Sequence, residues 1–199
     1  KRYFLKNNKI KFIEKNLIDE IKKQKINDAF PFFSLKKNIT GESKFSKLNK
    51  ISKYLKKVKS DYIFISAPEN VAWILNIRGK DSPNSPIPNS RLIISKSKNI
   101  YLFSKLKKCK ELIKKKIIQS NQFVDINKFS EKISNLKGKK FIIDKDTCSI
   151  FFENIIKSKF KIVERNDPTY HWKAIKNKVE IANMKKVHIL DGVAITKFI

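Results

Sequence analysis

Apolar residues along the chain fall into two alternating patterns. Short continuous runs, rich in Ile, Val, Phe and Tyr, predict β-strands. Between them, apolar residues recur every three or four positions and predict amphipathic helices. The predicted strands are 62–65, 91–95, 99–103, 123–126, 141–143 and 160–163, and the predicted helices lie within 45–58, 71–75, 106–117, 129–136, 150–156 and 177–199. This alternation predicts an α/β fold with a mixed β-sheet flanked by helices.

Capping and turn signals support several of these elements. Ser43 can cap the first long helix, whose opposite face is filled with lysines. The apolar face of that helix is expected to carry Phe45, Leu48, Ile51, Leu55 and Val58. The polar segment 96–98 separates two predicted strands and indicates a β-hairpin. Asn177 is expected to cap the last helix, with Glu180 at the capping-box position.

The stretch 66–89 follows the first predicted strand and has a distinct pattern. Pro68 suits the first turn of a helix, where its missing N–H costs nothing. The segment 71–75 is apolar nearly all round, which predicts a short buried helix. Gly79 is expected to end that helix with a positive φ. Three prolines then force an extended, loop-like path.

The N-terminal residues predict two elements ahead of the main domain. Apolar positions within 12–21 predict a short helix capped by Asn16. The apolar segment 30–33 is expected to pack as an extended piece.

The chain also shows boundary signals. The dipeptide Asp-Pro at 167–168 separates the last predicted strand from the last predicted helix. We therefore expect a main domain over 41–166, with 1–40 before it and 167–199 after it. The sequence begins without an initiator Met, and we interpret it as part of a longer protein.

The net charge of +28 suggests a partner with phosphate groups, but the kind of basic residue argues against a specific nucleic-acid site. Four of the 46 basic residues are Arg and 42 are Lys. Arg is the favoured residue for bidentate phosphate and base contacts. We favour a solvated lysine-rich surface, and a free-standing basic binding module stays as an alternative.

The cysteines and the hydropathy of the sequence indicate the cellular compartment of the protein. Cys109 and Cys148 are far apart and lack metal-site spacing, so two free thiols in a reducing compartment are expected. The sequence contains no apolar stretch of the roughly 18–20 residues that a membrane span needs, and no secretory segment. These features predict a cytoplasmic protein that does not cross a membrane.

Two segments carry a resemblance to a known family. The segment 69–81, Glu-Asn-Val-Ala-Trp-Ile-Leu-Asn-Ile-Arg-Gly-Lys-Asp, followed by Pro83, Asn84 and Pro86, resembles a signature of the three-domain Xaa-Pro aminopeptidases of the creatinase superfamily. The segment 173–181, Lys-Ala-Ile-Lys-Asn-Lys-Val-Glu-Ile, is similar to the start of their catalytic domain. The two lie in the order and spacing of the family.

This resemblance implies a domain plan and a function. Residues 1–40 would end the first N-terminal domain and form a linker, 41–166 would be the second creatinase-type N-terminal domain, and 167–199 would open the missing catalytic domain. The whole enzyme would remove an N-terminal residue preceding proline and would use two divalent metal ions, manganese in most members. The chain itself would be non-catalytic. It would shape access to the active site and support contacts between domains, and a homodimer is compatible with this plan.

No catalytic or metal-ligating residue is predicted within the chain. His171 and His188 lack nearby acidic residues at ligand spacing. Trp73, Arg78 and Asp81 are the candidates for structural or inter-domain contacts: Trp73 as a core residue, and Arg78 as a partner of a carboxylate such as Asp81 or of backbone carbonyls. A creatinase-like or prolidase-like relative of other specificity is the alternative within the same superfamily.

Overall fold

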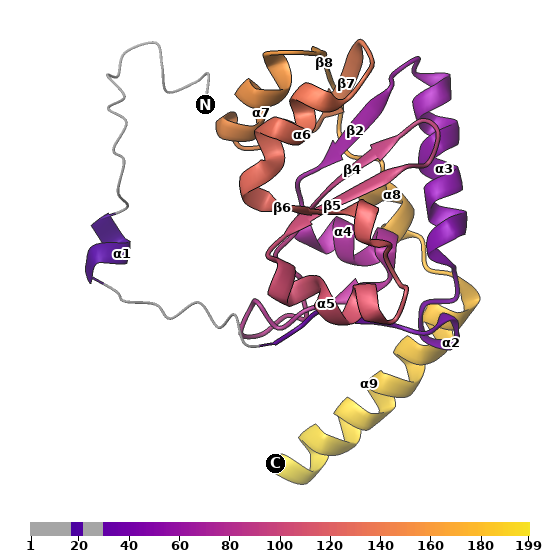
Figure 1. Ribbon diagram of the computed structural model, residues 1–199. Coiled ribbons are helices and arrows are strands. Elements are labelled where there is room, and N and C mark those ends of the chain that lie inside the picture. Colours follow the sequence, from indigo (N-terminus) through magenta and orange to yellow (C-terminus); the bar gives the residue numbers. More distant parts are fainter. Residues whose placement is uncertain (1–16, 22–29) are drawn as a thin grey trace, which may run out of the picture.

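The computed structural model of the protein describes residues 17–21 and 30–199 (Figure 1). Helix α1 (Leu17–Ile21) is the described part of the helix expected within 12–21, whose other residues, with the cap at Asn16, lie outside the described residues.

The centre of the fold is a six-stranded mixed sheet in the order β6-β5-β4-β2-β7-β8. Its strands are β2 (Tyr62–Ile65), β4 (Arg91–Ser95), β5 (Ile100–Ser104), β6 (Phe123–Asp125), β7 (Lys140–Ile143) and β8 (Lys161–Glu164). The pairs β2–β4 and β4–β5 are antiparallel, whereas β2–β7, β7–β8 and β5–β6 are parallel. The six strands and the hairpin predicted from the sequence are confirmed, with ends that differ by one residue at several positions.

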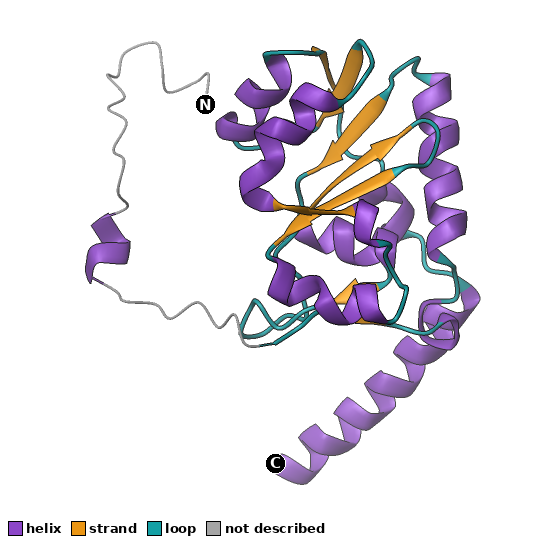
Figure 2. Cartoon of the chain, in the orientation of Figure 1, coloured by secondary structure: helices purple, strands orange, loops and turns teal. Residues whose placement is uncertain are grey.

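Helices cover both faces of this sheet (Figure 2). They are α3 (Lys44–Lys57), α4 (Pro68–Leu75), α5 (Leu106–Lys114), α6 (Phe129–Asn135) and α7 (Ile150–Lys157). Ile63 and Ile65 of β2 pack in one core with apolar residues of α3, α4 and α5, while Tyr62 and Phe64 pack in a second core with α6 and α7. Because both faces of β2 are covered, all four of its residues are buried and its sequence is continuously apolar.

A second, smaller layer joins the N-terminal segment to the domain. Strand β1 (Phe33–Ser34) pairs antiparallel with β3 (Ile77–Arg78). Phe32 is fully buried in the first core, and its backbone N–H donates to the carbonyl of Lys108 at 2.8 Å. The expected packing of 30–33 is therefore confirmed for Phe32, whereas Phe30 and Phe33 are 42% and 41% exposed. Helix α2 (Lys37–Thr40) and a turn at Gly41 then lead into α3.

The predicted caps of two helices are confirmed. The side chain of Ser43 accepts from the backbone N–H of Ser46 at the start of α3. Asn177 and Glu180 form the predicted capping box at the start of α9 (Lys178–Phe198), which follows the short helix α8 (Thr169–Ala174). Two remaining elements are short 3₁₀ turns, η1 (Ser120–Gln122) and η2 (Ile126–Lys128).

The lysine-rich helix α3 departs from its predicted pattern at two positions. Phe45, expected on the apolar face, is 62% exposed and lies under the ammonium group of Lys98. Lys47, expected on the solvated face, is 1% exposed. The rest of the predicted stripe packs as expected, since Leu48, Ile51 and Leu55 are buried.

Helix α9 extends away from the sheet layers (Figure 1). None of its residues is buried. Eight of its large apolar side chains are more than a third exposed: Ile181, Met184, Val187, Ile189, Leu190, Val193, Ile195 and Phe198. No helix within the described ranges is both long enough and apolar enough to cross a membrane.

Candidate inter-domain face

The resembled segment forms one structural unit, from the end of β2 through α4 and β3 into the loop before β4. Pro68 occupies the first turn of α4, as predicted. Asn76 is the C-cap residue of α4, in the left-handed conformation with φ of 54°. The prediction that Gly79 ends this helix with positive φ is wrong, because Asn76 already supplies the left-handed residue and β3 follows at once.

Gly79 is instead required by close packing. A Cβ atom at this position would lie 2.8 Å from Cα of Pro88 and 3.0 Å from Cδ1 of Phe32. The backbone N–H of Gly79 donates to the carbonyl of Pro86 at 3.2 Å, which folds the proline-rich loop back on β3. The missing side chain therefore lets three segments meet at one point.

Trp73 lies at the edge of the core. Its neighbours Ile74 and Leu75 are buried at 0% and 1% exposure, as predicted, whereas Trp73 itself is half-buried and packs against the first core from outside. Its indole Nε1–H is buried and has no hydrogen-bond partner in the described part of the chain. Trp73 therefore packs against the core as expected but is only partly buried, and its side chain also lines a groove.

Lys47 is the charged residue of this region that the sequence interpretation missed. Its ammonium group donates to the carbonyl of Trp73 at 2.7 Å and to Oδ1 of Asn76 at 2.6 Å, and it lies 4.0 Å from the centroid of the Trp73 ring. Burial lowers the pKa of Lys47 to about 8, although the carboxylates of Glu42 and Glu180 act in the opposite direction. The helical spacing from Lys47 to Ile51 and Leu55 was the signal that places it on the buried stripe.

Arg78 makes its contacts with backbone carbonyls of its own domain. Its Nη1 donates to the carbonyl of Ala72 at 3.1 Å and to that of Ile77 at 2.8 Å. Burial lowers the pKa of the guanidinium, and the carboxylate of Glu180 opposes this effect. The expected contact with backbone carbonyls is confirmed. Arg78 and Lys47 both bring positive charge to the C-terminal end of α4, where the helix dipole favours a cation.

Asp81 pairs with Lys108 and not with Arg78. The carboxylate of Asp81 lies 2.5 Å from Nζ of Lys108, and the two side chains are only 11% and 4% exposed. A second oxygen of Asp81 accepts from the backbone N–H of Asn89 at 2.6 Å. The proposed Arg78–Asp81 pair is therefore wrong: the loop after Gly79 carries Asp81 toward α5, where a buried lysine compensates its charge.

The segment after the last strand is joined to α4 by a polar network. Asn70, fully buried, donates to Oδ2 of Asp167 at 2.7 Å and accepts from Nζ of Lys173 at 2.5 Å. The backbone N–H of Asp167 donates to Oδ2 of Asp144 at 2.7 Å, and burial raises the pKa of the Asp167 carboxyl. The Tyr170 hydroxyl donates to Glu69 at 2.8 Å. The Asp-Pro break is thus anchored on the domain.

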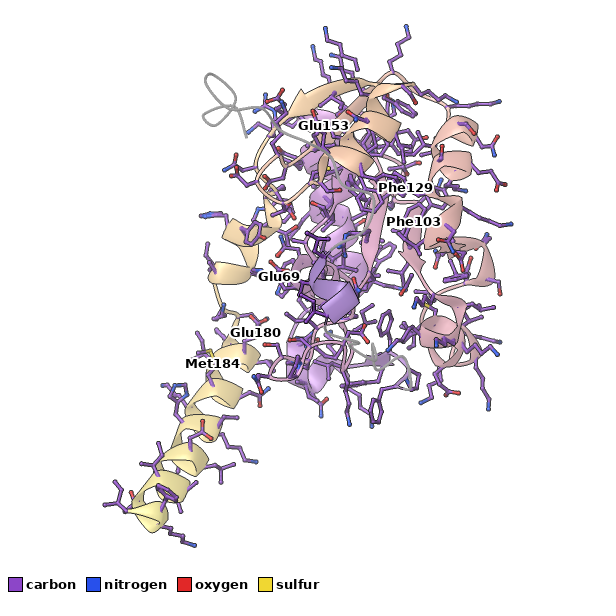
Figure 3. The ribbon with its side chains drawn as sticks, turned by 90° about the vertical axis from the view of Figure 1, so that its left-hand side faces the viewer. Glu69, Phe103, Phe129, Glu153, Glu180 and Met184 are labelled. Atoms are coloured by element: carbon purple, nitrogen blue, oxygen red, sulfur yellow. The ribbon has the colours of Figure 1, made fainter. Side chains whose placement is uncertain are left out.

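A groove of about 350 Å³ lies between α4, the proline-rich loop and the start of α9. Its lining includes Trp73, Arg78, Lys173, Lys176, Glu69 and Glu180. Figure 3 shows Glu69 and Glu180 on the same side of the molecule, near the point where α9 leaves the domain. A half-buried indole with three cations and two carboxylates has the character of a contact surface.

The described residues offer no arrangement of three or more His, Cys, Asp or Glu side chains that could hold a metal ion. His171 is exposed, and Nδ1 of His188 lies 2.8 Å from the carbonyl of Met184 one turn earlier in α9. Cys109 and Cys148 form no disulfide bond, as predicted, and both are buried; burial raises the pKa of the Cys109 thiol to about 12. We therefore assign no metal ligand and no nucleophile to these residues.

The sequence and the fold place the chain in a known class of domain. The profile of the Creatinase/Prolidase N-terminal domain matches residues 22–180, and the chain belongs to that family. Among curated relatives, Xaa-Pro aminopeptidase 1 of Dictyostelium discoideum is 31% identical over 201 residues, covering 96% of this chain and 32% of the relative. An Xaa-Pro aminopeptidase of Drosophila melanogaster is 29% identical over 197 residues, covering 94% and 31%.

Solved structures share the fold. The X-prolyl aminopeptidase of Caenorhabditis elegans, described as a cytosolic enzyme with a di-nuclear active site, matches with a TM-score of 0.78 at 24% identity, over 94% of this chain and 31% of that one. The Xaa-Pro dipeptidase of Bacillus anthracis matches with a TM-score of 0.61 at 16% identity, over 79% and 44%. The chain spans about a third of the length of the curated relatives it matches.

Proposed function

We propose that the chain is the non-catalytic N-terminal portion of a metal-dependent Xaa-Pro aminopeptidase, which removes an N-terminal residue preceding proline. The observation that carries this proposal is the similarity to Xaa-Pro aminopeptidase 1 of Dictyostelium discoideum along 96% of the chain. In this plan, residues 1–40 end a first N-terminal domain, 41–166 form the second, and 167–199 lead into the catalytic domain.

The exposure of apolar side chains on α9 supports this division into domains. An isolated helix gains most of its stability by packing an apolar face against a partner. The described structure leaves Ile181, Met184 and Val187 between 43% and 51% exposed, and Figure 3 shows Met184 on the part of α9 that projects from the domain. We assign the catalytic domain as the partner that covers this side of α9.

The metal chemistry is assigned to residues outside this chain. Two divalent ions, manganese in our proposal, would be held in the catalytic domain, in keeping with the di-nuclear active site ascribed to the Caenorhabditis elegans enzyme. The substrates would be peptides with proline at the second position. The chain itself would shape access to that site and provide contacts between domains, and we place the protein in the cytoplasm, with a homodimer as its assembly.

A dipeptidase of the same superfamily is the second candidate. It is favoured by the shared fold with the Xaa-Pro dipeptidase of Bacillus anthracis over 79% of this chain. The two candidates differ in substrate length, because a dipeptidase accepts only a dipeptide. A comparison of Xaa-Pro dipeptides with longer Xaa-Pro peptides, using the chain extended to the length of its relatives, separates them.

The experiment for the main proposal compares two proteins. The 199-residue chain should neither bind manganese stoichiometrically in calorimetry nor hydrolyse Xaa-Pro peptides. The same chain extended by the rest of its reading frame should do both, because a two-metal hydrolase needs several convergent carboxylates and imidazoles. Activity in the short chain, or inactivity in a folded long chain, would overturn the proposal.

A further inference from the structure

Asparagine side chains at the start of α9 donate hydrogen bonds to the C-terminal end of the short helix α2. The last carbonyls of a helix have no partner within the helix and must find one elsewhere. Nδ2 of Asn177 donates to the carbonyl of Thr40 at 2.9 Å. Nδ2 of Asn183 donates to the carbonyl of Ile39 at 3.2 Å and to that of Asn38 at 3.4 Å. Two asparagines of α9 therefore supply hydrogen bonds to three successive carbonyls of α2.

Asn177 serves two helix ends at once. Its Oδ1 accepts from the backbone N–H groups of Val179 and Glu180, both at 3.0 Å, and so caps the start of α9. Its Nδ2 donates to the end of α2. One amide side chain thus joins the positive end of one helix dipole to the negative end of another.

Gly41 makes room for this contact. It has φ of +68°, a conformation in which a side chain is strained. A Cβ atom built on Gly41 would lie 2.1 Å from Oδ1 of Asn177 and 2.7 Å from its Nδ2. Any side chain at position 41 would therefore push Asn177 out of its position against α2.

Hydrogen bonds connect this contact between Asn177 and α2 to the core of the domain. The carbonyl of Glu42, next to Gly41, accepts from Nδ2 of Asn76 at 2.8 Å. Oδ1 of the same Asn76 accepts from the buried ammonium group of Lys47. A continuous chain of hydrogen bonds therefore runs from the α2–α3 turn to the C-terminal end of α4 in the core.

We propose that Asn177, Asn183 and Gly41 form a clamp that fixes the direction of α9 relative to the central sheet. In the longer protein these three would be positioning residues, because the direction of α9 sets where the part that follows it lies. That second step rests on the proposed function; the clamp itself does not.

The clamp is tested by a distance measurement in this chain. Spin labels on Lys53→Cys in α3 and Asp191→Cys in α9 would report the direction of the helix by pulsed electron paramagnetic resonance. Both positions are exposed, and the native Cys109 and Cys148 are buried and protected from labelling. Residue 191 is about 21 Å along the helix from Asn177 at a rise of 1.5 Å per residue, so a change of direction becomes a change of distance.

Asn177→Asp is the decisive variant. Aspartate keeps an oxygen that caps α9 but replaces the donor to Thr40 by a second acceptor, so the helix stays capped while the clamp is broken. Gly41→Ala should have the same effect by displacing Asn177. The control is Gly138→Ala, which also places a side chain at a positive φ, of 154°, but against Asp61 on another part of the domain.

We expect Asn177→Asp and Gly41→Ala to shift or broaden the distance distribution, in Asn177→Asp with unchanged helix content by circular dichroism, while Gly138→Ala leaves the distribution as in the parent chain. An unchanged distribution in Asn177→Asp would overturn the clamp. In the extended protein, Asn177→Asp should lower kcat for Xaa-Pro peptides at unchanged thermal midpoint, and an unchanged kcat would overturn the positioning role. Inactivity of the extended parent protein would count against the proposed function and leave the distance result standing.

Discussion

The ammonium group of Lys47 lies 4.0 Å from the centroid of the Trp73 indole ring and 2.7 Å from the carbonyl oxygen of the same residue. One cation from α3 thus binds both the aromatic face and the backbone at the end of α4. Arg78 adds a second cation at the same helix end through the carbonyl of Ala72. Helix α4 has no basic residue in its own last turn, so the negative end of its dipole is compensated by cations from neighbouring elements.

The buried Lys47 predicts a dependence of stability on pH. Its pKa is about 8 in the folded chain, below the ordinary value of 10.5. Between these two pH values the unfolded chain binds more protons at this residue than the folded chain, so the contribution of Lys47 to the free energy of unfolding increases as the pH rises. We expect this contribution to grow by on the order of 3 kcal/mol over that window.

The measurement is urea unfolding at pH 8 and pH 10.5 on the parent chain and on Lys47→Met. The difference between the two proteins isolates Lys47 from the other groups that titrate in this range, such as the Cys109 thiol of the unfolded chain, whose ordinary pKa is 9.0. Lys50→Met, at a half-exposed lysine on the same helix, is the matched control and should keep the pH dependence of the parent. Equal pH dependence in the parent chain and Lys47→Met would contradict the prediction.

The Asp81–Lys108 pair predicts a strongly non-additive mutant cycle. Both side chains are nearly buried, so removing Asp81 takes a compensating charge from Lys108, which keeps its hydrogen bond to the carbonyl of Phe30. Asp81→Asn should lower the free energy of unfolding by about 3 kcal/mol, while the double variant Asp81→Asn/Lys108→Met should recover much of that loss. Removal of the exposed Glu111–Lys115 pair should change stability by less than about 0.5 kcal/mol. Additive single effects would show that the buried pair is not coupled.

The substitution Arg78→Lys keeps the positive charge but should still lower the free energy of unfolding. Nη1 of the guanidinium donates to the carbonyls of Ala72 and Ile77 together, and the lysine side chain, which is one atom shorter, does not place its ammonium group at the same point. We expect the free energy of unfolding to fall by roughly 1–2 kcal/mol. Arg165→Lys, at an exposed arginine, is the control and should be neutral. If both variants unfold at the same urea concentration as the parent chain, the backbone contacts of Arg78 do not stabilise β3.

The regular elements could be predicted from the sequence because their signals are local. Tyr62–Ile65 is a continuous apolar run bounded by polar residues, and it forms β2 with the predicted bounds. Ser43 and Asn177 are caps whose partners lie two or three residues away. In each case the residues that decide the structure are neighbours in the chain, and the pattern alone contains the information.

The contacts around α4, β3 and the proline-rich loop could not be predicted in the same way, because they depend on distant segments of the chain. Asp81 meets Lys108 only because β1, β3 and α5 assemble side by side, and nothing near Asp81 in the sequence indicates that partner. Gly79 is a residue type that commonly ends helices, but here glycine is needed because a Cβ atom would lie too close to Pro88 and Phe32. Lys47 did carry a local signal, its spacing from Ile51, which the assumption of a solvated lysine face obscured.

Two glycines predict opposite effects of the same substitution. Gly79→Ala should destabilise the chain by on the order of 1–3 kcal/mol, because the added Cβ would lie 2.8 Å from the backbone of Pro88 and the loop would have to move. Gly192→Ala should increase the helix content of α9 and stabilise that helix by up to about 1 kcal/mol, because alanine has a higher helix propensity and, outside the helix's own backbone, no described residue lies within 4 Å of the new Cβ. Urea unfolding measures the first effect and far-ultraviolet circular dichroism the second. If Gly79→Ala were neutral, the loop would yield to a methyl group, and the tight junction of β3, Pro88 and Phe32 would not be what requires glycine there.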